Sequence, residues 1–391
     1  MRDLDSSSLS VEPKLAIWQS IFHALDNERC LDQRYRATRT LLKDDASVPN
    51  YKVMKQLALK SKLGFLYRPF IVSALVLMPI LAMLQWLSAV FVSVAHLGKP
   101  SEATLHVVPT SQGNIGLIEA ALCNDPAMIG RPQDRDILVF SRLCTEMGLT
   151  GVLFCIASHI HLLFHILRTD RRKRADLILH SRDAFVLLML VCYARSHPSH
   201  VFVTDDHYQR WAFLLSHNCG DFRIVQHGFL DPNIVFAHSF GVVHSLYVCD
   251  PIFLPEFEAY YKMLESRSFS PITDLTTNLY SEVGLFLASS FPSIDEEIEL
   301  LTQIKARRDV PVIVKFHPAH SYDSGKQRLA ALASYVCADD ENPTCKVFVS
   351  HNSFMEFAYK ARGIPTFSIA RSGGSSEAAQ AILALFDQPP L

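Results

Sequence analysis

Four polar clusters in the second half of the sequence carry side chains suited to group transfer. They cover residues 204–207 (TDDH), 226–228 (QHG), 315–318 (KFHP) and 350–353 (SHNS), and each directly follows a short apolar run. Glu356 comes shortly after the last of them. Ligands of open parallel sheets bind beyond the carboxyl ends of the strands. If the apolar runs are such strands, we expect the four clusters to converge on one site.

The two later clusters are suited to binding a nucleotide-linked donor. A leaving phosphate or diphosphate develops negative charge, which cationic and hydrogen-bond-donating groups such as Lys315 and His317 stabilise. Backbone N–H groups at the start of the helix after Ser353 favour an anion, and Glu356 could hold a pair of ribose hydroxyls. The remaining candidates on this side are Pro318, Ser350 and Asn352.

The two earlier clusters are suited to activating an acceptor. A hydroxyl acceptor needs a general base, and Asp205, Asp206 or His227 could serve. Gly228 would let the backbone approach a ligand closely, and Gln226 lies beside it. The sequence therefore predicts an acceptor side made of these five residues.

Structural roles remain open for the same residues. Asp205 and Asp206 could cap the following helix, and His227 could be a buried, hydrogen-bonded histidine. The His-Pro pair at 317–318 could form only a turn, and Ser353 could be an N-cap and nothing more.

The elements that must position these side chains have an α/β pattern. After residue 100, short apolar runs alternate with helix-length segments, which is typical of parallel sheets covered by helices. Strands are predicted at 103–109, 136–140, 200–204, 222–226, 245–249, 283–289, 310–316, 345–350 and 364–369. Helices are predicted at 295–307, 325–337, 354–362 and 375–386. The helix at 295–307 is expected to open with a capping box of Ser293 and Glu296.

We predict two Rossmann-like domains in series. The first covers 101–265 and holds the acceptor, the second covers 282–391 and holds the nucleotide donor, and the polar stretch 266–281 links them. Residues 1–100 form a separate helical region, with an amphipathic helical patch at 15–42.

Residues 69–98 contain no charged side chain and exceed the roughly 20 residues that span a bilayer. A second apolar stretch covers 149–167 and precedes a basic cluster at 168–174. We interpret 149–167 as a helix of the first α/β domain, and 69–98 as a re-entrant or in-plane membrane segment bent near Pro79. A buried core helix is the alternative for 69–98, and two bilayer-spanning helices are the alternative for the pair.

Composition excludes several other classes of protein. The net charge of −2 opposes a general nucleic-acid binder. Nine scattered cysteines without a CxxC pair favour reduced thiols in the cytosol over disulfides or a zinc site. We interpret the D-x-D spacing of Asp134 and Asp136 as a surface turn, and no metal and no cofactor are predicted. The N-terminus shows no signal-peptide core.

Three segments resemble bacterial surface-polysaccharide transferases with the GT-B fold, a group that includes capsule-type sugar transferases and CDP-glycerol glycerophosphotransferases. The first segment is RIVQHGFLDP at 223–232 followed by SLYVCDPIFLPEFEAYY at 245–261. The other two are VIVKFHPAH at 312–320 and VFVSHNSFMEFAYKARGIPTF at 347–367. The resemblance covers roughly residues 200–391. It implies that Lys315, His317, Ser353 and Glu356 line the nucleotide site and that His227 lies across the cleft.

This sequence departs from the family in two ways. The common Lys-Pro-His-Pro form is KFHP here, and the tryptophan-containing histidine motif of the glycerophosphotransferases is missing.

The expected function is transfer of a sugar from a nucleotide-activated sugar to a glycan or lipid-linked acceptor in surface polysaccharide (capsule) biosynthesis. The expected location is the cytoplasmic face of the inner membrane. Two alternatives remain: a polyol-phosphate transferase of the CDP-glycerol type, and a non-catalytic, membrane-bound assembly partner.

Overall fold

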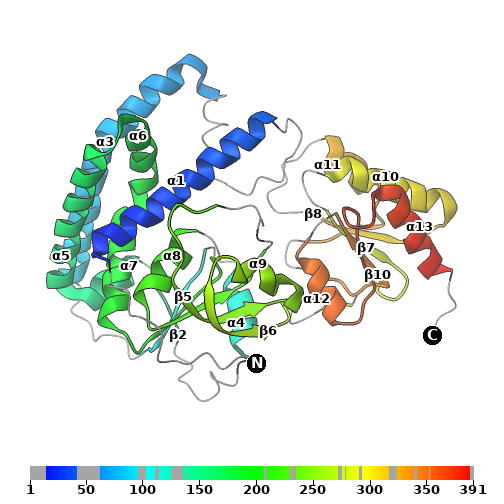
Figure 1. Cartoon of the computed structure of the whole chain (residues 1–391). Helices are drawn as coiled ribbons and strands as arrows, with labels where there is room; N and C mark the ends of the chain where they lie inside the picture. Colours follow the sequence, from blue (N-terminus) through cyan, green and yellow to red (C-terminus); the bar gives the residue numbers. More distant parts are fainter. Residues whose placement is uncertain are drawn as a thin grey trace.

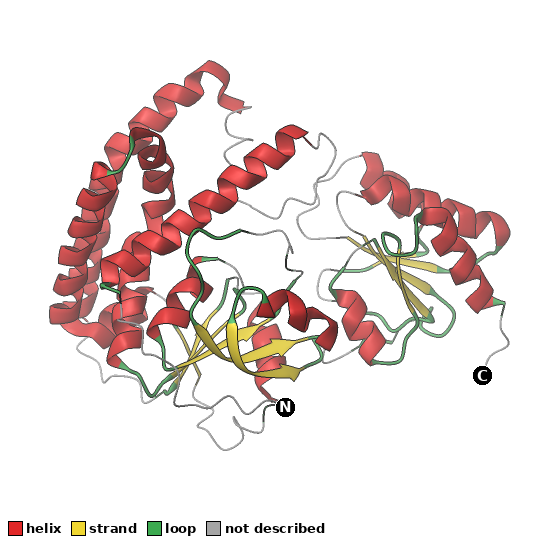
Figure 2. Ribbon diagram, viewed as in Figure 1, coloured by secondary structure: helices red, strands yellow, loops and turns green. Residues whose placement is uncertain are grey.

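The protein is an α/β protein with two parallel sheets (Figures 1 and 2). The computed structural model describes residues 15–41, 62–95, 103–110, 114–123, 125, 135–138, 140–206, 209–228, 230, 235–271, 275–277, 279–289, 293–316, 324–338, 341–351 and 353–387.

The first sheet has six strands among the described residues, in the order β2-β1-β3-β4-β5-β6, and every neighbouring pair is parallel. Its strands are β1 (Leu105–Val108), β2 (Arg135–Ile137), β3 (Val201–Thr204), β4 (Asp221–Val225), β5 (Val242–Val248) and β6 (Lys262–Ser268). Because helices cover both faces, the central strands are buried on both sides and read as continuous apolar runs.

Alternate side chains of this sheet enter two different cores. Val203 and Val225 pack with α4 (Ile115–Cys123) on one face. Phe202 and Ile224 face the opposite side, where α7 (Ala184–Ser196) and α8 (Arg210–Asn218) cover the sheet.

The second sheet has the order β11-β10-β7-β8-β9 among the described residues, again with all pairs parallel. Its strands are β7 (Leu285–Ser289), β8 (Val312–Phe316), β9 (Tyr335–Val336), β10 (Val347–Ser350) and β11 (Thr366–Ser368). One face packs against α10 (Ile294–Arg307), α11 (Ser324–Leu332) and α13 (Ser375–Phe386). The other face packs against α12 (Met355–Ala361), where the rings of Tyr359 and Phe348 stack 4.5 Å apart.

All nine predicted strands are confirmed, but four other predictions are wrong. β6 extends to Ser268, inside the predicted linker, because an edge strand with alternating exposure can be polar. The helix predicted to reach residue 337 ends at Leu332, and β9 follows it. Asp136 lies inside β2 and not in a turn. The capping box of α10 does not form, since the Ser293 side chain makes no cap hydrogen bond.

A layer of long helices packs against α7 and α8, the helices that cover one face of the first sheet (Figure 1). The layer consists of α1 (Ile17–Leu41), α3 (Tyr67–Ala95), α5 (Phe140–Arg168) and α6 (Arg171–His180). The short helix η2 (Gly64–Leu66) precedes α3, and the short helix η5 (Ser181–Asp183) leads from α6 into α7. The predicted helix at 149–167 is the main part of α5, whose inner face belongs to the same core as α7 and α8. Ile21 and Leu25 of α1 enter that core as well.

Two of these helices are long and apolar enough to cross a membrane, judged by length and composition alone: Leu77–Ala95 within α3, and α5. Pro79 lies inside α3, which continues through it.

One contact joins a segment that follows a strand of the first sheet to a helix that follows a strand of the second. β5 leads into the short helices η6 (Pro251–Phe253) and α9 (Leu254–Glu258), which lie beside α12 (Figure 1). The rings of Phe253 and Phe357 lie 4.7 Å apart, and the ammonium of Lys360 lies 3.3 Å from the carboxylate of Asp250. Because α12 follows β10 as η6 follows β5, this contact joins the carboxyl-edge segments of the two sheets.

Candidate active site

Asp205 and His227 form a fixed pair at the carboxyl edge of the first sheet. Asp205 follows β3 and is fully buried. Its carboxylate accepts hydrogen bonds from the backbone N–H of Thr110, at 2.7 Å, and from the side chains of Thr110 and Asn114. Its backbone carbonyl accepts a hydrogen bond from Nδ1 of His227, which follows β4. Two neighbouring strands and the loop after β1 therefore position one imidazole.

This contact decides how the imidazole can act. A carbonyl oxygen only accepts, so Nδ1 of His227 carries the hydrogen and Nε2 is the basic atom of the neutral ring. The side chain is about one-third exposed, so it is accessible from the sheet edge. The Asp205 carboxylate lies 3.7 Å from Nδ1 and would stabilise the positive ring after it takes a proton. Together these features suit a general base.

Asp206 has a different set of contacts. It is almost fully buried, and its carboxylate accepts the backbone N–H groups of Gln209, Trp211 and Ala212 at 2.8, 2.8 and 3.2 Å. These bonds satisfy donors at the start of α8, which is the helix-capping role left open by the sequence. The Asp205–His227 pair is therefore better suited to act as a base than Asp206, and a catalytic role for either stays an untested prediction.

Gln226 and Gly228 flank the histidine. The Gln226 side chain accepts the N–H of Cys249 at 3.2 Å and donates to the carbonyl of Gly228 at 3.2 Å, which ties the ends of β4 and β5 together. A Cβ added at Gly228 would meet no atom of the described structure within 4 Å. Among the described residues, no atom would therefore obstruct a ligand beside this backbone.

Two serines organise the corresponding edge of the second sheet. Ser350 Oγ accepts the N–H of Ser353 at 3.0 Å, and Ser353 Oγ accepts the N–H of Met355 at 3.3 Å. These bonds occupy two of the N–H groups around the start of α12, where the sequence predicted a phosphate. Ser353 thus forms a turn before α12, but the N-cap of α12 is Phe354, so the N-cap alternative for Ser353 is not confirmed.

Glu356 lies at the start of α12 and is buried. Burial raises the pKa of its carboxyl, while the guanidinium of Arg371 opposes that shift. Arg371, which follows β11, forms an ion pair with Glu356 and is half-exposed. Its guanidinium also lies 5.8 Å from the ring centre of Phe357. A carboxylate and a guanidinium are therefore held together next to the carboxyl ends of β10 and β11.

Lys315 has its ammonium directed at a neighbouring loop. Nζ donates to the carbonyl of Glu341 at 2.7 Å and to Oδ1 of Asn342 at 3.1 Å. These partners place the charge on the loop between β9 and β10, so a phosphate would have to compete with them. The other predicted donor-side residues, His317, Pro318 and Asn352, lie outside the described residues.

The sequence interpretation overlooked Arg371 and the glycine pair that follows it. Gly373 and Gly374 have φ angles of 91° and 122°, which only glycine adopts readily, and they lead into α13. The N-cap of α13, Gly374, provides no side-chain hydrogen bond, so N–H groups at this helix start could be satisfied by an anion. The signal was present as the sequence RSGGSS at 371–376, directly after a predicted strand. Thr110 and Asn114 were also overlooked, and no local pattern marks them.

No protein-family model matches this sequence, and no curated protein sequence matches it.

Proposed function

We propose that this protein is a glycosyltransferase of the GT-B type that transfers a sugar from a nucleotide-activated sugar to a glycan or lipid-linked acceptor. The proposal rests on Asp205-held His227 at the carboxyl edge of the first sheet and on Glu356 and Arg371 at that of the second. The segments that follow these edges touch through Phe253 and Phe357. The first group is suited to deprotonating a hydroxyl, and the second to binding a nucleotide. The resemblance of residues 223–232, 312–320 and 347–367 to surface-polysaccharide transferases supports the same assignment.

In the proposed reaction, Nε2 of His227 takes the proton of the acceptor hydroxyl. The acceptor oxygen forms a bond to the anomeric carbon of the sugar as the bond from that carbon to the donor phosphate breaks. The nucleotide leaves with the bonding electrons, and its added negative charge is stabilised by cationic and N–H groups. Arg371 and the start of α13 supply such groups, and Glu356 would hold a ribose hydroxyl pair.

We also propose that α3 and α5 lie along the cytoplasmic face of a membrane. Large apolar side chains are exposed along both helices, an amount of apolar surface that soluble monomers rarely leave open. They are Val72, Leu77, Ile80, Leu81, Met83, Leu84, Leu87, Phe91 and Val94 of α3, and Leu149, Leu153, Phe154, Ile160, Phe164 and Leu167 of α5.

The opposite face of α5 belongs to the core that also contains α7. A bilayer-spanning α5 would draw the α/β domain into the hydrocarbon with it, so an in-plane arrangement fits better. The basic cluster at 168–174 follows α5 and would attract the anionic lipids of a cytoplasmic leaflet.

The test of the transfer reaction is incorporation of labelled sugar from a panel of UDP-, GDP- and CMP-activated sugars into membranes that contain the endogenous acceptor. The full chain should use at least one donor, and His227→Gln should abolish incorporation while the nucleotide still binds. Arg328→Ala is the control, because it breaks an exposed ion pair with Asp295 in the second domain, 3.3 Å long. Incorporation by His227→Gln at the rate of the unaltered chain would reject the assigned base.

A further inference from the structure

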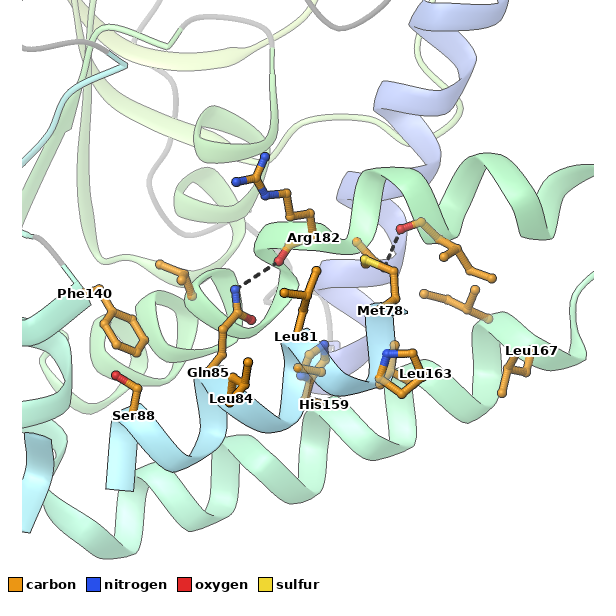
Figure 3. A pocket seen from close by; sticks show the side chains of 16 residues that line it. Met78, Leu81, Leu84, Gln85, Ser88, Phe140, His159, Leu163, Leu167 and Arg182 are labelled. Atoms are coloured by element: carbon orange, nitrogen blue, oxygen red, sulfur yellow. Dashed lines mark hydrogen bonds between the residues drawn. The ribbon is translucent and has the colours of Figure 1, made fainter. Parts of the chain in front are cut away.

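The long helices of the first domain contact one another mainly through apolar side chains. Between α3 and α5 they leave a cavity of about 700 Å³, and leucines such as Leu81, Leu84 and Leu163 line it (Figure 3). A group of titratable side chains lies elsewhere in this layer, where α1 meets the connection from β4 to β5. The contacts of this group hold the connection against α1.

The backbone of His238 is the point at which α1 holds this connection. Asn27 of α1 is buried, and its side chain accepts the N–H of His238 at 2.8 Å and donates to the carbonyl of the same residue at 3.0 Å. On the other side, Nε2 of His217 in α8 donates to the carbonyl of Ser239 at 3.0 Å. Residues 235–241 therefore lie between two helices, and the amide of His238 reports their contact with α1.

Two histidine rings meet face to face at the same contact. The ring of His23 on α1 stacks on the ring of His238, with 3.9 Å between the ring centres and 4° between the planes. Nε2 of His238 lies 3.3 Å from the carboxylate of Asp26, which also accepts Nε–H of Arg29 at 2.7 Å. A proton on the His238 ring therefore faces an opposite charge. A further proton on His23 would place two positive rings in van der Waals contact, which is unfavourable.

The surroundings of His23 favour its neutral form. The side chain is half-buried, and the titratable groups around it among the described residues are His238, His217 and Asp26. Burial lowers the pKa of the ring, His238 and His217 lower it further, and Asp26 opposes the shift. In water the ring has its ordinary pKa of 6.5, so a released His23 binds a proton more readily than a docked one. The stabilisation from this contact is therefore complete above about pH 6.5 and is lost as the pH falls below it.

We propose that His23 and His238 form an acid-sensitive clasp, which holds residues 235–241 against α1 at neutral pH and releases them in acid. In the chain, this segment lies between His227, the candidate base, and β5. Acid thus frees the connection that leads away from the candidate base. The clasp goes beyond the transferase function and does not depend on it, since amide hydrogen exchange reports the contact without any substrate.

The test is hydrogen exchange of the full chain at pH 7.5 and pH 5.5, read by mass spectrometry on peptides that contain the amide of His238. The rates are corrected for the pH dependence of intrinsic exchange. At pH 5.5 a released ring with a pKa of 6.5 is protonated about ten times as often as it is neutral. The protection of the His238 amide should therefore fall about five- to tenfold between the two pH values. Peptides that cover β8 of the second sheet should keep their protection.

Two substitutions keep a ring that can stack but takes up no proton in this range: His23→Phe and His23→Tyr. Two are used so that one can fail to fold without ending the test, and thermal unfolding at pH 7.5 checks each. In both, protection at pH 5.5 should stay within about twofold of the value that the unaltered chain has at pH 7.5. The matched control is His244→Gln, because His244 is a half-buried histidine of β5 outside the clasp, and the full fall should remain.

Three results would overturn the proposal. The first is equal protection of the His238 amide at both pH values in the unaltered chain. The second is a fall of the same size in a folded His23 variant, which would attribute the acid sensitivity to other histidines. The third is low protection at pH 7.5 in both folded variants, because a neutral stacked ring would then not be what holds the segment.

Discussion

Asp205→Asn tests whether the Asp205–His227 pair depends on the charge of Asp205 or only on its geometry. The substitution keeps the size of the side chain and the backbone carbonyl that holds Nδ1 of His227. It removes the negative charge that lies 3.7 Å from that nitrogen. Two unit charges about 4 Å apart interact by about 4 kcal/mol at an effective dielectric constant of about 20. Because His227 is one-third exposed, we take about half of this value for the protonated ring, which corresponds to a rate loss of about 30-fold.

The assay is the rate of sugar transfer at saturating donor, measured beside nucleotide affinity. Asp205→Asn should lower kcat about 30-fold and leave nucleotide affinity unchanged, since the nucleotide is assigned to the other sheet. It should also lower stability by about 2–4 kcal/mol, because the new amide presents a donor to the side chain of Asn114.

Thr110→Ala is the matched control for that loss of stability. It removes one hydrogen bond to the Asp205 carboxylate but keeps the charge, so it should cost about 1 kcal/mol of stability and change kcat by less than about threefold. If Asp205→Asn and Thr110→Ala both unfold at a lower denaturant concentration but transfer sugar at the normal rate, the role of Asp205 is only structural and His227 acts without it.

Three further predictions concern stability. Glu28→Gln breaks the buried ion pair with Arg210 that joins α1 to α8. It should lower the free energy of unfolding, measured in urea, by about 3–5 kcal/mol. A loss below about 1 kcal/mol would show that this pair does not hold α1 in place. The hydrogen bond from His238 lowers the pKa of Asp26 to about 2, with a further contribution from Arg29. The folded pKa lies below the unfolded value of 3.8, so this stabilisation is present above pH 3.8 and is lost as the pH falls toward 2. The free energy of unfolding falls between pH 6 and pH 2.5 as Asp26 becomes protonated. Asp26→Asn should make this fall smaller by about 1 kcal/mol, after allowance for solvent screening. A fall of unchanged size would contradict the assignment. Gly374→Ala places a side chain at φ 122° and should cost about 1–3 kcal/mol of stability. The control is Gly116→Ala within α4, whose added Cβ meets no described atom within 4 Å, so it should be neutral or stabilising. Equal Tm values for the two variants would argue against strain at Gly374.

The parallel sheets could be predicted from the sequence because their strands are buried on both faces. Runs such as VPVIV at 310–314 and VFV at 347–349 are apolar throughout, and turn-forming or helical segments separate them. β6 was not predicted as a strand, because it pairs with one neighbour only and its residues alternate between half-buried and exposed. Its polar end therefore has the composition of a linker.

The candidate site was predictable only in part. The rule that ligands bind beyond the strand ends identified Asp205 and His227, but their contact depends on the parallel register of β3 and β4. Glu356 was recognised from its motif, whereas Arg371 lies 15 residues away and meets it only after β11 has paired with β10. The direction of Lys315 is likewise set by the loop at 341–342, which no local pattern reveals.

The central claim, a nucleotide site at the carboxyl edge of the second sheet, is tested most directly by thermal shift with UDP, GDP, CDP and CMP. A ligand that binds only the native state raises the apparent stability as its concentration exceeds the dissociation constant. We predict that one nucleotide raises the Tm of the full chain, that the shift is lost in His317→Ala and Glu356→Ala, and that it persists in Arg328→Ala. If none of the four nucleotides shifts the Tm, or if the shift survives in both site variants, the donor site is wrongly assigned and the non-catalytic alternative gains support.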